Sequence, residues 1–495
     1  MELENQQVDM QDLYKEADIR KHKINTLINK GEIVYKERFE RTHKIVDAVK
    51  LNAGERVSVA GRVIARRIFG KFMFIKIQDV EARIQISLSV NEIDLPKYEF
   101  FKDMVDLGDF VGATGELYYT KTEELTVRAE NYELLSKAMY PLPEKFHGLS
   151  DTEAKYRQRY LDLISNENTR KVLYGRIKFI SLIRKYLTDN GFLEVETPIL
   201  QSAVCGASAR PFLTKHNALN LQMNLRIAPE TYLKQIIAGG FDRVFEVAKC
   251  FRNEGMDASH LQEFTQVEWY ASYWNFEDNI KFFTGFLRFL VTEMTGEPIL
   301  RKEGREFDLS KDFPRINYTE TLNKLLGFDI VEPNTVDELK EKVIASGVFR
   351  KDEMDGLITI GAVVDYMYKR KIRPNIIEPT ILFNYPAALV PLARRNDKNP
   401  KLIDMFQLLI NGEEICKAYS ELVDPIEQRR ALEDQAAAKL LGDEEAMDLD
   451  EGFLLAVEHG MPPISGLGFG IDRFMIMLFD EPSIRDVIFF PIMKE

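Results

Sequence analysis

Between residues 57 and 136 the chain is dominated by short segments in which apolar and polar positions alternate. Five such segments follow one another between glycine-containing or charged turns: RVSVAGRVIARRI, KFMFIKIQD, ARIQISLS, FVGATGELYYT and ELTVRAENYELLS. A period of two residues is typical of β-strands with one buried face. Strands of this kind in this number predict a small Greek-key barrel of the OB type.

The pattern changes on the N-terminal side of this segment and again after it. Residues 10–50 have helical spacing and are locally basic, with Gly31 as a break. They form either a solvated helix face or a surface that faces RNA, and the pattern does not separate the two. Residues 138–160 contain prolines and a glycine ahead of a charged helical run, which predicts a connection between domains.

Beyond this connection helical and strand-like patterns mix, which predicts an α+β fold. We expect a helix near 170–190, an extended segment FLEVETPIL, strands around 245–270 and a final helix after GLGFGIDR. The windows 334–375 and 425–452 have helical patterns and are interpreted as surface insertions.

Composition narrows the class of protein. With 495 residues, 45% of them hydrophobic, the chain is long enough for more than one core. No stretch approaches the roughly eighteen consecutive apolar residues of a membrane helix, and the start MELENQQVDM lacks an apolar signal region, so we expect a cytoplasmic protein without a membrane segment. The formal net charge of −13 argues against a general attraction to nucleic acids, although local patches can differ. Cys205, Cys250 and Cys416 show no C-x-x-C spacing and are expected to be buried thiols.

One local patch lies in the predicted barrel, where cations and aromatic rings interleave. The segment RVIARRIFGKFMF carries three of each: Arg66, Arg67 and Lys71 with Phe69, Phe72 and Phe74. Barrels of this type bind single-stranded nucleic acid by stacking bases on aromatic rings while cations follow the backbone. Aromatic residues also fill barrel cores, so this segment by itself leaves nucleic-acid binding open.

The polar stretch FRNEGMDASHLQEF joins two apolar segments and raises the question of its chemistry. No P-loop, H-E-x-x-H or G-x-S-x-G signature occurs in the chain. The segment GLGFG lacks the G-x-G-x-x-G spacing of a dinucleotide site.

Three segments together resemble a known family. GFLEVETPIL, FRNEG…HLQEFTQVEWY and GLGFGIDRFMIML are similar to the three signature motifs of class II aminoacyl-tRNA synthetases. GASARPFLTKHN, LRIAPETYLK, GGFDRVFE, AYSELVDP and PSIRDVIFFP resemble the lysyl-tRNA synthetases within that class. The resemblance covers nearly the whole chain from about residue 20, and the set of motifs is specific where any one motif would be weak.

The resemblance implies a domain order and a reaction. The order is a helical extension at 1–50, an OB-fold anticodon-binding domain at 51–140, a linker at 141–165 and a class II catalytic domain with an antiparallel sheet at 166–495. A homodimer is implied by the first motif. The implied activity is ATP-dependent activation of L-lysine to lysyl-adenylate and pyrophosphate, followed by transfer of lysine to the 3'-terminal adenosine of tRNA(Lys).

The resemblance also implies the ATP site. Arg252 and Arg473 would be the catalytic arginines, the first bridging the lysine carboxylate and the α-phosphate and the second holding the γ-phosphate. The alternative for these arginines is a surface ion pair, as with Glu246 or Glu254. The other implied ATP contacts are an adenine ring between Phe264 and Arg473, an adenine amino group on Glu254, phosphates near His260, and Glu414.

The lysine and anticodon sites are implied in the same way. An acidic pocket suits a substrate with two ammonium groups. The implied lysine contacts are Glu421 and Tyr270 at the ε-ammonium, Gly206, Glu230 and Glu268 at the α-amino end, and Tyr419 on the aliphatic stem. The implied anticodon contacts are Phe74, Gln85 and Glu124.

Two positions depart from the family pattern. Glu414 matches a magnesium-binding glutamate, but Gln407 stands where the family usually has a second one, so an amide oxygen would have to serve Mg²⁺ there. Lys417 stands where the family commonly has an asparagine. We expect its ammonium to face the carboxylate of the substrate lysine.

Three other functions compete with this one. A related ligase transfers lysine to a protein, but its relatives resemble the catalytic domain alone, so the barrel argues against it. A non-catalytic RNA-binding relative is favoured by Gln407 and Lys417 and opposed by the intact Arg252 and Arg473. An enzyme for aspartate or asparagine shares the architecture, but an acidic pocket would repel an acidic side chain.

Overall fold

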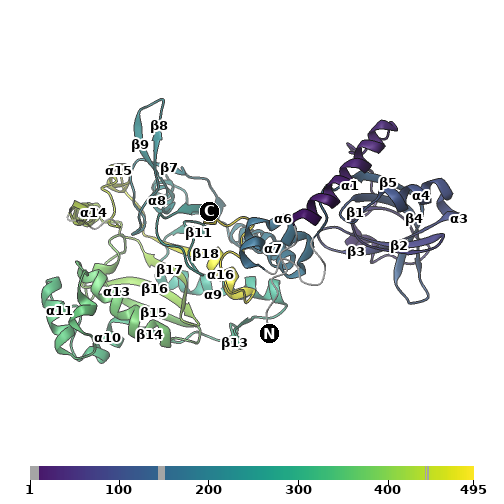
Figure 1. Ribbon diagram of the computed structural model, residues 1–495. Coiled ribbons are helices and arrows are strands. Elements are labelled where there is room, and N and C mark those ends of the chain that lie inside the picture. The colour runs from purple at the N-terminus through teal and green to yellow at the C-terminus, as the bar shows by residue number, and fades with distance from the viewer. Residues whose placement is uncertain (1–9, 143–150, 441, 443–444, 495) are drawn as a thin grey trace, which may run out of the picture. The chain divides into compact units, whose positions relative to one another are not determined.

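The computed structural model describes residues 10–142, 151–440, 442 and 445–494, and the chain divides into two compact units, 1–170 and 171–495. The elements of both units are labelled in Figure 1. Among the described residues, no helix is long and apolar enough to cross a membrane.

The first unit begins with one helix, α1 (Met10–Asn29), followed by chain that is mostly not helical. The helix stops before Gly31, whose φ of +79° lies in the left-handed region that favours glycine. The prediction of helix through residues 30–50 is therefore wrong, apart from the single turn α2 (Ile45–Ala48). The Lys36 backbone N–H donates to the carbonyl oxygen of Leu135 at 2.9 Å, so this stretch bonds to the barrel instead of to itself.

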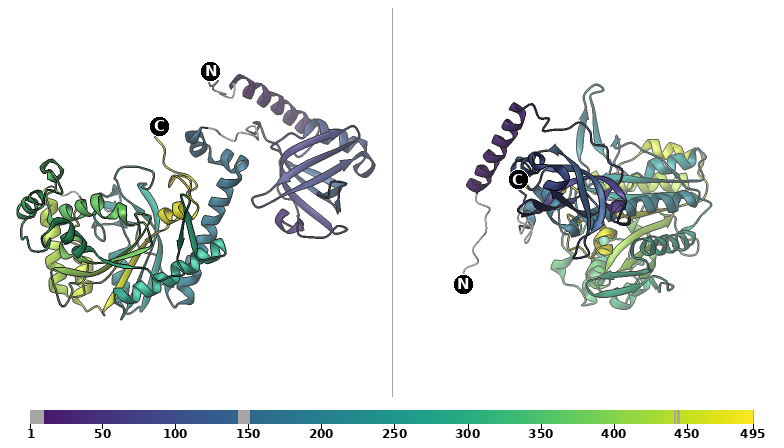
Figure 2. Two further views of the ribbon diagram at one scale, coloured as in Figure 1. Left: turned by 90° about the horizontal axis from the view of Figure 1, so that it is seen from below. Right: turned by 90° about the vertical axis from the view of Figure 1, so that its right-hand side faces the viewer.

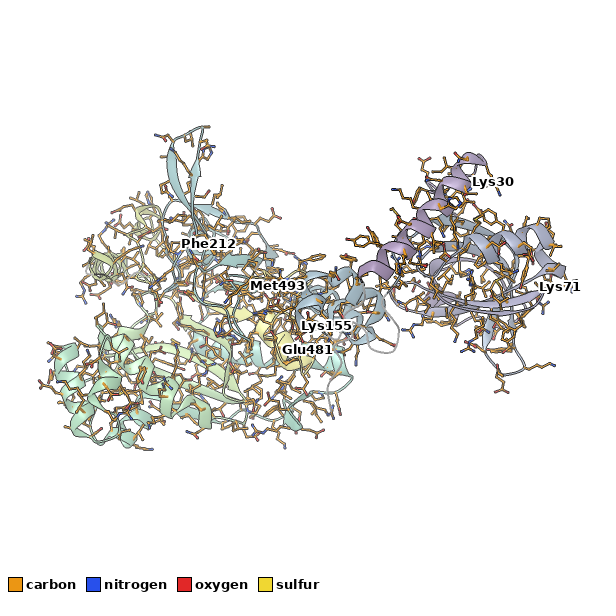
Figure 3. The ribbon with its side chains drawn as sticks, in the orientation of Figure 1. Lys30, Lys71, Lys155, Phe212, Glu481 and Met493 are labelled. Atoms are coloured by element: carbon orange, nitrogen blue, oxygen red, sulfur yellow. The ribbon has the colours of Figure 1, made fainter. Side chains whose placement is uncertain are left out.

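The five predicted strands are confirmed and form a closed barrel in the order β1-β2-β3-β5-β4, seen in two views in Figure 2. They are β1 (Arg56–Phe69), β2 (Phe72–Gln78), β3 (Arg83–Ser89), β4 (Phe110–Tyr119) and β5 (Leu125–Ser136). Two helices, α3 (Val90–Ile93) and α4 (Leu95–Met104), connect β3 to β4. Lys71 lies in the turn between β1 and β2, at an edge of the barrel (Figure 3).

The described part of the predicted linker is helical. It contains α5 (Thr152–Arg157) and α6 (Arg159–Ser165), and α7 (Glu167–Asp189) follows at once. Residues 143–150, which carry the expected break in structure, lie outside the described residues. In α6 a buried ion pair joins Arg159 to Asp162 at 2.9 Å.

The second unit is built on an eight-stranded sheet in the order β14-β15-β16-β17-β18-β11-β10-β6. The edge strands β14 and β6 pair in parallel, and the strands between them pair antiparallel, so the predicted antiparallel catalytic sheet is confirmed. The strands are β6 (Leu193–Glu194), β10 (Arg243–Phe251), β11 (Glu263–Ser272), β14 (Arg315–Asn317), β15 (Thr380–Pro386), β16 (Leu402–Ile410), β17 (Glu413–Ser420) and β18 (Ile464–Gly470).

One face of this sheet is covered by α7, α9 (Phe276–Thr295) and α16 (Ile471–Leu478). Its core is aromatic, with Phe179, Trp269, Phe286, Phe469 and Phe474 packed together. The hairpin of β12 (Ile299–Lys302) and β13 (Arg305–Asp308) lies against this side. The final helix begins at Ile471, inside the GLGFGIDR motif and not after it.

The other face carries the remaining helices, whose positions in the unit are visible in Figure 1. They are α8 (Glu230–Ala238), α10 (Tyr318–Leu326), α11 (Val336–Ala345), α12 (Lys351–Met354), α13 (Ile360–Lys371), α14 (Pro425–Leu440) and α15 (Glu451–Glu458). A small sheet of β7 (Leu200–Gln201), β8 (Leu213–His216) and β9 (Leu221–Leu225) adjoins them.

The window 334–375 is helical as expected, but it is not a surface insertion. Leu339, Val363 and Met367 are fully buried and belong to the core on this face of the sheet. Apolar positions spaced three and four apart give these helices a buried stripe.

Candidate active site

A cavity of about 810 Å³ opens on the second face of the sheet, within the unit 171–495. With the exception of Glu421, the residues that the sequence assigned to ATP, lysine and magnesium line it together: Gly206, Glu230, Arg252, Glu254, His260, Phe264, Glu268, Tyr270, Gln407, Glu414, Lys417, Tyr419 and Arg473. These residues are up to 267 positions apart in the chain, so the sheet is what assembles them.

The floor of the cavity is a row of glycines in β18. Alternation along this strand points Leu467 and Phe469 into the aromatic core, while Gly466, Gly468 and Gly470 line the cavity. A Cβ on Gly466 would lie 2.2 Å from Cε1 of Tyr270. GLGFG is therefore part of a strand in which the glycines, because they have no side chains, leave room for the side chains of the neighbouring strands.

The two strands beside β18 supply the walls. Gly466 pairs with Tyr270 of β11 and with Tyr419 of β17. Gly468 pairs with Glu268 on the first side and Lys417 on the second. Each glycine thus lies between two large side chains that point into the same space.

A buried lysine organises the acidic end of the cavity. Nζ of Lys234 lies 2.6 Å from Oε1 of Glu230 and forms a second ion pair with Glu421. Oε1 of Glu230 also accepts a hydrogen bond from the Tyr419 hydroxyl at 2.6 Å. Burial by itself lowers the pKa of Lys234, but Glu230 and Glu421 raise it above its usual value, so this side chain is an ammonium.

Sequence reasoning did not identify Lys234, and it assigned Glu421 to direct contact with the substrate ammonium. Glu421 does not line the cavity; its side chain lies on the same face of β18 as Tyr270, where a Cβ on Gly466 would be 2.5 Å from Oε1 of Glu421. That oxygen is buried and receives no hydrogen bond from the described residues. The i, i+4 spacing of Glu230 and Lys234 on α8 was the available signal for the pair.

Glu268 is a carboxyl group that burial keeps protonated. Burial, and then the charge of Glu230, raise its pKa to about 8. Nε2 of Gln266 donates to its Oε1 at 2.6 Å, and the Tyr270 hydroxyl lies 3.2 Å from Oε2. At neutral pH the group is mostly neutral until a positive ligand lies beside it.

Arg252 begins the loop between β10 and β11 and has no anionic partner among the described residues. Its guanidinium lies over the ring of Phe264, with Cζ 5.0 Å from the ring centre. Its Nε is buried and without a hydrogen bond. Glu246 pairs with Arg226 at 2.6 Å instead, so the surface ion pair considered for Arg252 is not what the structure contains.

The same loop links His260 to Arg473. Nη2 of Arg473 and Nε2 of His260 are 2.9 Å apart, and Nδ1 of His260 is 2.9 Å from both carboxylate oxygens of Asp257. Because a guanidinium only donates, Nε2 must be the acceptor and Nδ1 carries the proton. Glu254 is exposed in this loop and faces the cavity.

A β-bulge brings Glu414 into the site. The register of β16 and β17 shifts between Leu408 and Leu409, which lets Glu414 line the cavity together with Lys417. Nε2 of Gln407 donates to Oε2 of Glu414 at 2.7 Å, and Oε1 of Gln407 accepts from the Tyr385 hydroxyl at 2.6 Å. Lys417 lies opposite Gln407 in the register, and burial lowers its pKa.

These contacts do not fit the expected magnesium site of Glu414 and Gln407. Mg²⁺ takes oxygen ligands, yet the amide oxygen of Gln407 is engaged by Tyr385 and its NH₂ group faces the carboxylate. Among the described residues no cluster of three or more histidine, cysteine, aspartate or glutamate side chains could hold a metal ion.

Helix α13 contributes residues that sequence reasoning did not assign. Asp365 and Tyr368 line the cavity from this helix. Gly361 also lines it, and a Cβ there would lie 2.7 Å from the carbonyl oxygen of Ala388. The buried apolar stripe of the window 334–375 was the signal that it packs on the site.

In the barrel, the three predicted anticodon residues lie on one face, with Phe74 in β2, Gln85 in β3 and Glu124 immediately before β5. Phe74 forms edge-on ring contacts with Phe72 at 4.7 Å and Phe69 at 6.5 Å. Gln85 donates from Nε2 to Thr126 at 2.9 Å, and Glu124 pairs with Lys76 at 2.6 Å. Lys76 lies opposite Gln85 and two positions from Phe74, which places all of these side chains on the same face.

Two family models match separate segments of the chain. Residues 151–494 match the model described as tRNA synthetases class II (D, K and N), and residues 57–135 match the OB-fold nucleic acid binding domain. The lysine--tRNA ligase of Haemophilus influenzae (strain PittEE) is 43% identical, with 100% of both chains covered. The chain belongs to the lysine--tRNA ligase family.

Other members of the family are similarly close. The lysine--tRNA ligase of Bacillus subtilis (strain 168) is 39% identical, with 98% of both chains covered. That of Aquifex aeolicus (strain VF5) is 42% identical over 93% of this chain and 77% of its own. The predicted family and fold class are confirmed by these matches.

We predict that Lys234→Met destabilises the protein, because two buried carboxylates lose their shared counter-ion. The expected cost at neutral pH is about 3–5 kcal/mol. It should shrink as pH falls, since the unpaired carboxyl groups then take up protons. Thermal unfolding at several pH values from 5.5 to 8.5 measures both effects.

Lys185→Met is the matched control, because it removes a lysine from an exposed pair with Asp189. Its expected cost is at most about 1 kcal/mol. Equal stability of Lys234→Met and Lys185→Met would contradict the role given to Lys234.

Proposed function

We propose that this chain is a lysine--tRNA ligase that activates L-lysine with ATP to lysyl-adenylate and pyrophosphate, and then transfers lysine to the 3'-terminal adenosine of tRNA(Lys). One observation carries the proposal: a single cavity joins an acidic end, built on Glu230 and Glu268, to an end with Arg252 and Arg473. A cationic amino acid and a polyphosphate need these two environments side by side.

The acidic end has the charge that a lysine side chain requires. Glu230 and Glu421 share the single ammonium of Lys234, so the carboxyl groups at this end outnumber the cations and suit a further ammonium from a substrate. Tyr270 would receive the ε-ammonium, and Gly206, Glu230 and Glu268 would contact the α-amino end, while Glu421, which does not line the cavity, would act through its ion pair with Lys234. A shorter or neutral side chain would leave buried carboxylate oxygens unpaired, which is a strong basis for discrimination.

Within the described residues, Arg252 and Arg473 at the cationic end have no anionic partner, as a triphosphate site needs. Arg252 can donate to the lysine carboxylate and the α-phosphate together, and Arg473 to the γ-phosphate once it turns from His260. Phe264 offers a ring face for adenine and Glu254 an acceptor for its amino group.

The reaction requires no protein nucleophile or general base. The lysine carboxylate attacks the α-phosphorus, the bond to the bridging oxygen breaks, and pyrophosphate leaves with its electrons. Arg252 neutralises both anions on approach and strengthens its hydrogen bonds as charge grows on the phosphoryl oxygens. Mg²⁺ would enter with ATP and neutralise its phosphates, since the part of the chain that the structure describes offers Glu414 but no fitting second ligand.

The barrel would read the anticodon of the tRNA. Phe74 supports stacking of an unpaired base, and Lys76 with Glu124 and Gln85 offers donors and acceptors beside it. A family of ligases that acts on a protein lysine has no use for this barrel, so its match to a nucleic acid binding domain favours tRNA as the acceptor.

The homodimer and the cytoplasmic location stay predictions. Support for the dimer comes from Ile177 on α7 and Leu193 and Leu200 near the first motif, with 52%, 54% and 45% of their surfaces exposed. Apolar side chains exposed together on neighbouring elements suit a second copy of the chain.

Lysine-dependent exchange of pyrophosphate into ATP tests the activation step. Exchange with lysine and none with ornithine or arginine is the expected result. Tight binding of anticodon RNA without any exchange would favour the non-catalytic RNA-binding alternative.

We predict that lysine binding releases protons because it ionises Glu268. At pH 7 the ligand-free group holds most of one proton, and an ammonium beside it lowers its pKa, so that proton leaves; above pH 8 the release shrinks because the group is already ionised. Calorimetry in buffers of different ionisation enthalpy counts the protons.

Glu268→Gln should abolish the release, while Glu263→Gln, an exposed acid on the same strand, should leave it unchanged. A release that survives in Glu268→Gln would assign the proton to another group.

We predict that Phe74→Ala weakens binding of a uridine-rich anticodon stem-loop by about 1–3 kcal/mol, through loss of one stacked base. Phe110→Ala removes an exposed ring from β4, away from this face, and should change the affinity little. Fluorescence anisotropy with labelled RNA measures both. Equal losses in the two variants would mean that Phe74 does not stack on a base.

A further inference from the structure

Gln407 is held in one orientation by its two neighbours. Its carbonyl oxygen accepts from Tyr385 at 2.6 Å, and its NH₂ group donates to Glu414 at 2.7 Å. A carboxylate only accepts hydrogen bonds, so the reverse orientation would place two acceptors against each other. A metal ion on that oxygen of Glu414 would meet the NH₂ donor.

Lys417 supplies a positive charge at the same place. It lies directly opposite Gln407 between β16 and β17, and Glu414 is the carboxylate that acts on it most strongly. Its other neighbour in the sheet is Gly468, which has no side chain to cover it. Among the described residues nothing forms a hydrogen bond or ion pair with its ammonium, and the side chain lines the cavity.

The neutral side chain of Gln407 and the positive charge of Lys417 together determine the formal charge around Glu414. Two glutamates at 407 and 414 with one divalent cation would sum to zero. Neutral Gln407, one carboxylate and the Lys417 ammonium also sum to zero. The chain therefore keeps the local charge that a metal ion would provide, while its described residues offer that ion no second ligand beside Glu414.

We propose that the Lys417 ammonium replaces a protein-bound divalent cation where the substrate carboxylate meets the α-phosphate, so that the chain binds ATP with only the metal that the nucleotide brings. The proposal rests on the proposed function and names the cation of that site. An ammonium offers three donors to phosphate and carboxylate oxygens without demanding octahedral geometry. Arg252 lies close enough to act on Lys417 electrostatically, so the two cations face the reacting anions together.

The first experiment counts Mn²⁺ bound to the full chain without nucleotide, by electron paramagnetic resonance. The natural chain should bind none with sub-millimolar affinity. The double variant Gln407→Glu/Lys417→Asn should gain one site per chain, because two carboxylates then face each other. Equal numbers of ions on the two proteins would overturn the proposal.

The second experiment measures ATP binding in excess EDTA by calorimetry, without lysine. Lys417→Met should weaken binding at least about tenfold through loss of a charged contact. The control Lys369→Met removes a cavity lysine that is paired with Asp365 at 2.7 Å, and its affinity should stay within about twofold of the natural chain. Unchanged affinity of a folded Lys417→Met would also overturn the proposal.

Neither readout uses lysine or tRNA. Failure of lysine-dependent exchange would reject the proposed function while leaving these two measurements interpretable. Conversely, exchange could succeed in a chain that binds Mn²⁺ through its own carboxylates.

Discussion

The buried ammonium of Lys234 is the constraint on which the acidic end of the cavity depends. Two carboxylates from different parts of the chain, Glu230 on α8 and Glu421 after β17, cannot be removed from water together without a counter-ion. Lys234 supplies it, and in doing so ties the helix to the sheet. Rings of Tyr270, Tyr419 and Phe453 lie 5.6–6.0 Å from its nitrogen and complete its surroundings.

From this fixed end the charge changes sign along the cavity. Glu268 and Lys417 flank Gly468 from β11 and β17, and Arg252 begins the loop after β10, the strand on the other side of β11. The glycines of β18 leave the space between these side chains open.

Under our proposal, the pair of Gln407 and Lys417 replaces a bound ion with a side chain in one wall of the cavity. The two residues lie opposite each other on the adjacent strands β16 and β17, so a change of charge at one position alters the electrostatic environment of the other. The amide of Gln407 forms hydrogen bonds with both Tyr385 and Glu414, whereas a carboxylate at this position would be repelled by Glu414. Lys417 supplies the positive charge beside them. The other residues that the motifs named for ATP and lysine, apart from Glu421, line the same cavity.

Local patterns determined most of the fold. Alternation predicted the barrel strands of residues 57–136, and the motif residues predicted which side chains share the cavity. These features depend on neighbours in the chain, where a period of two or of three to four residues carries the information.

Only the tertiary structure decided the arrangement around particular side chains. The bulge that turns Glu414 into the site, the placing of Glu421 beside Gly466, the ion pair of Lys234 with Glu421 and the packing of α13 against the cavity each depend on tertiary contacts. Register and burial are properties of the assembled sheet, which local periodicity does not specify. For that reason the sequence by itself named the residues of the site, whereas which of them meet, and with what charge, followed from packing.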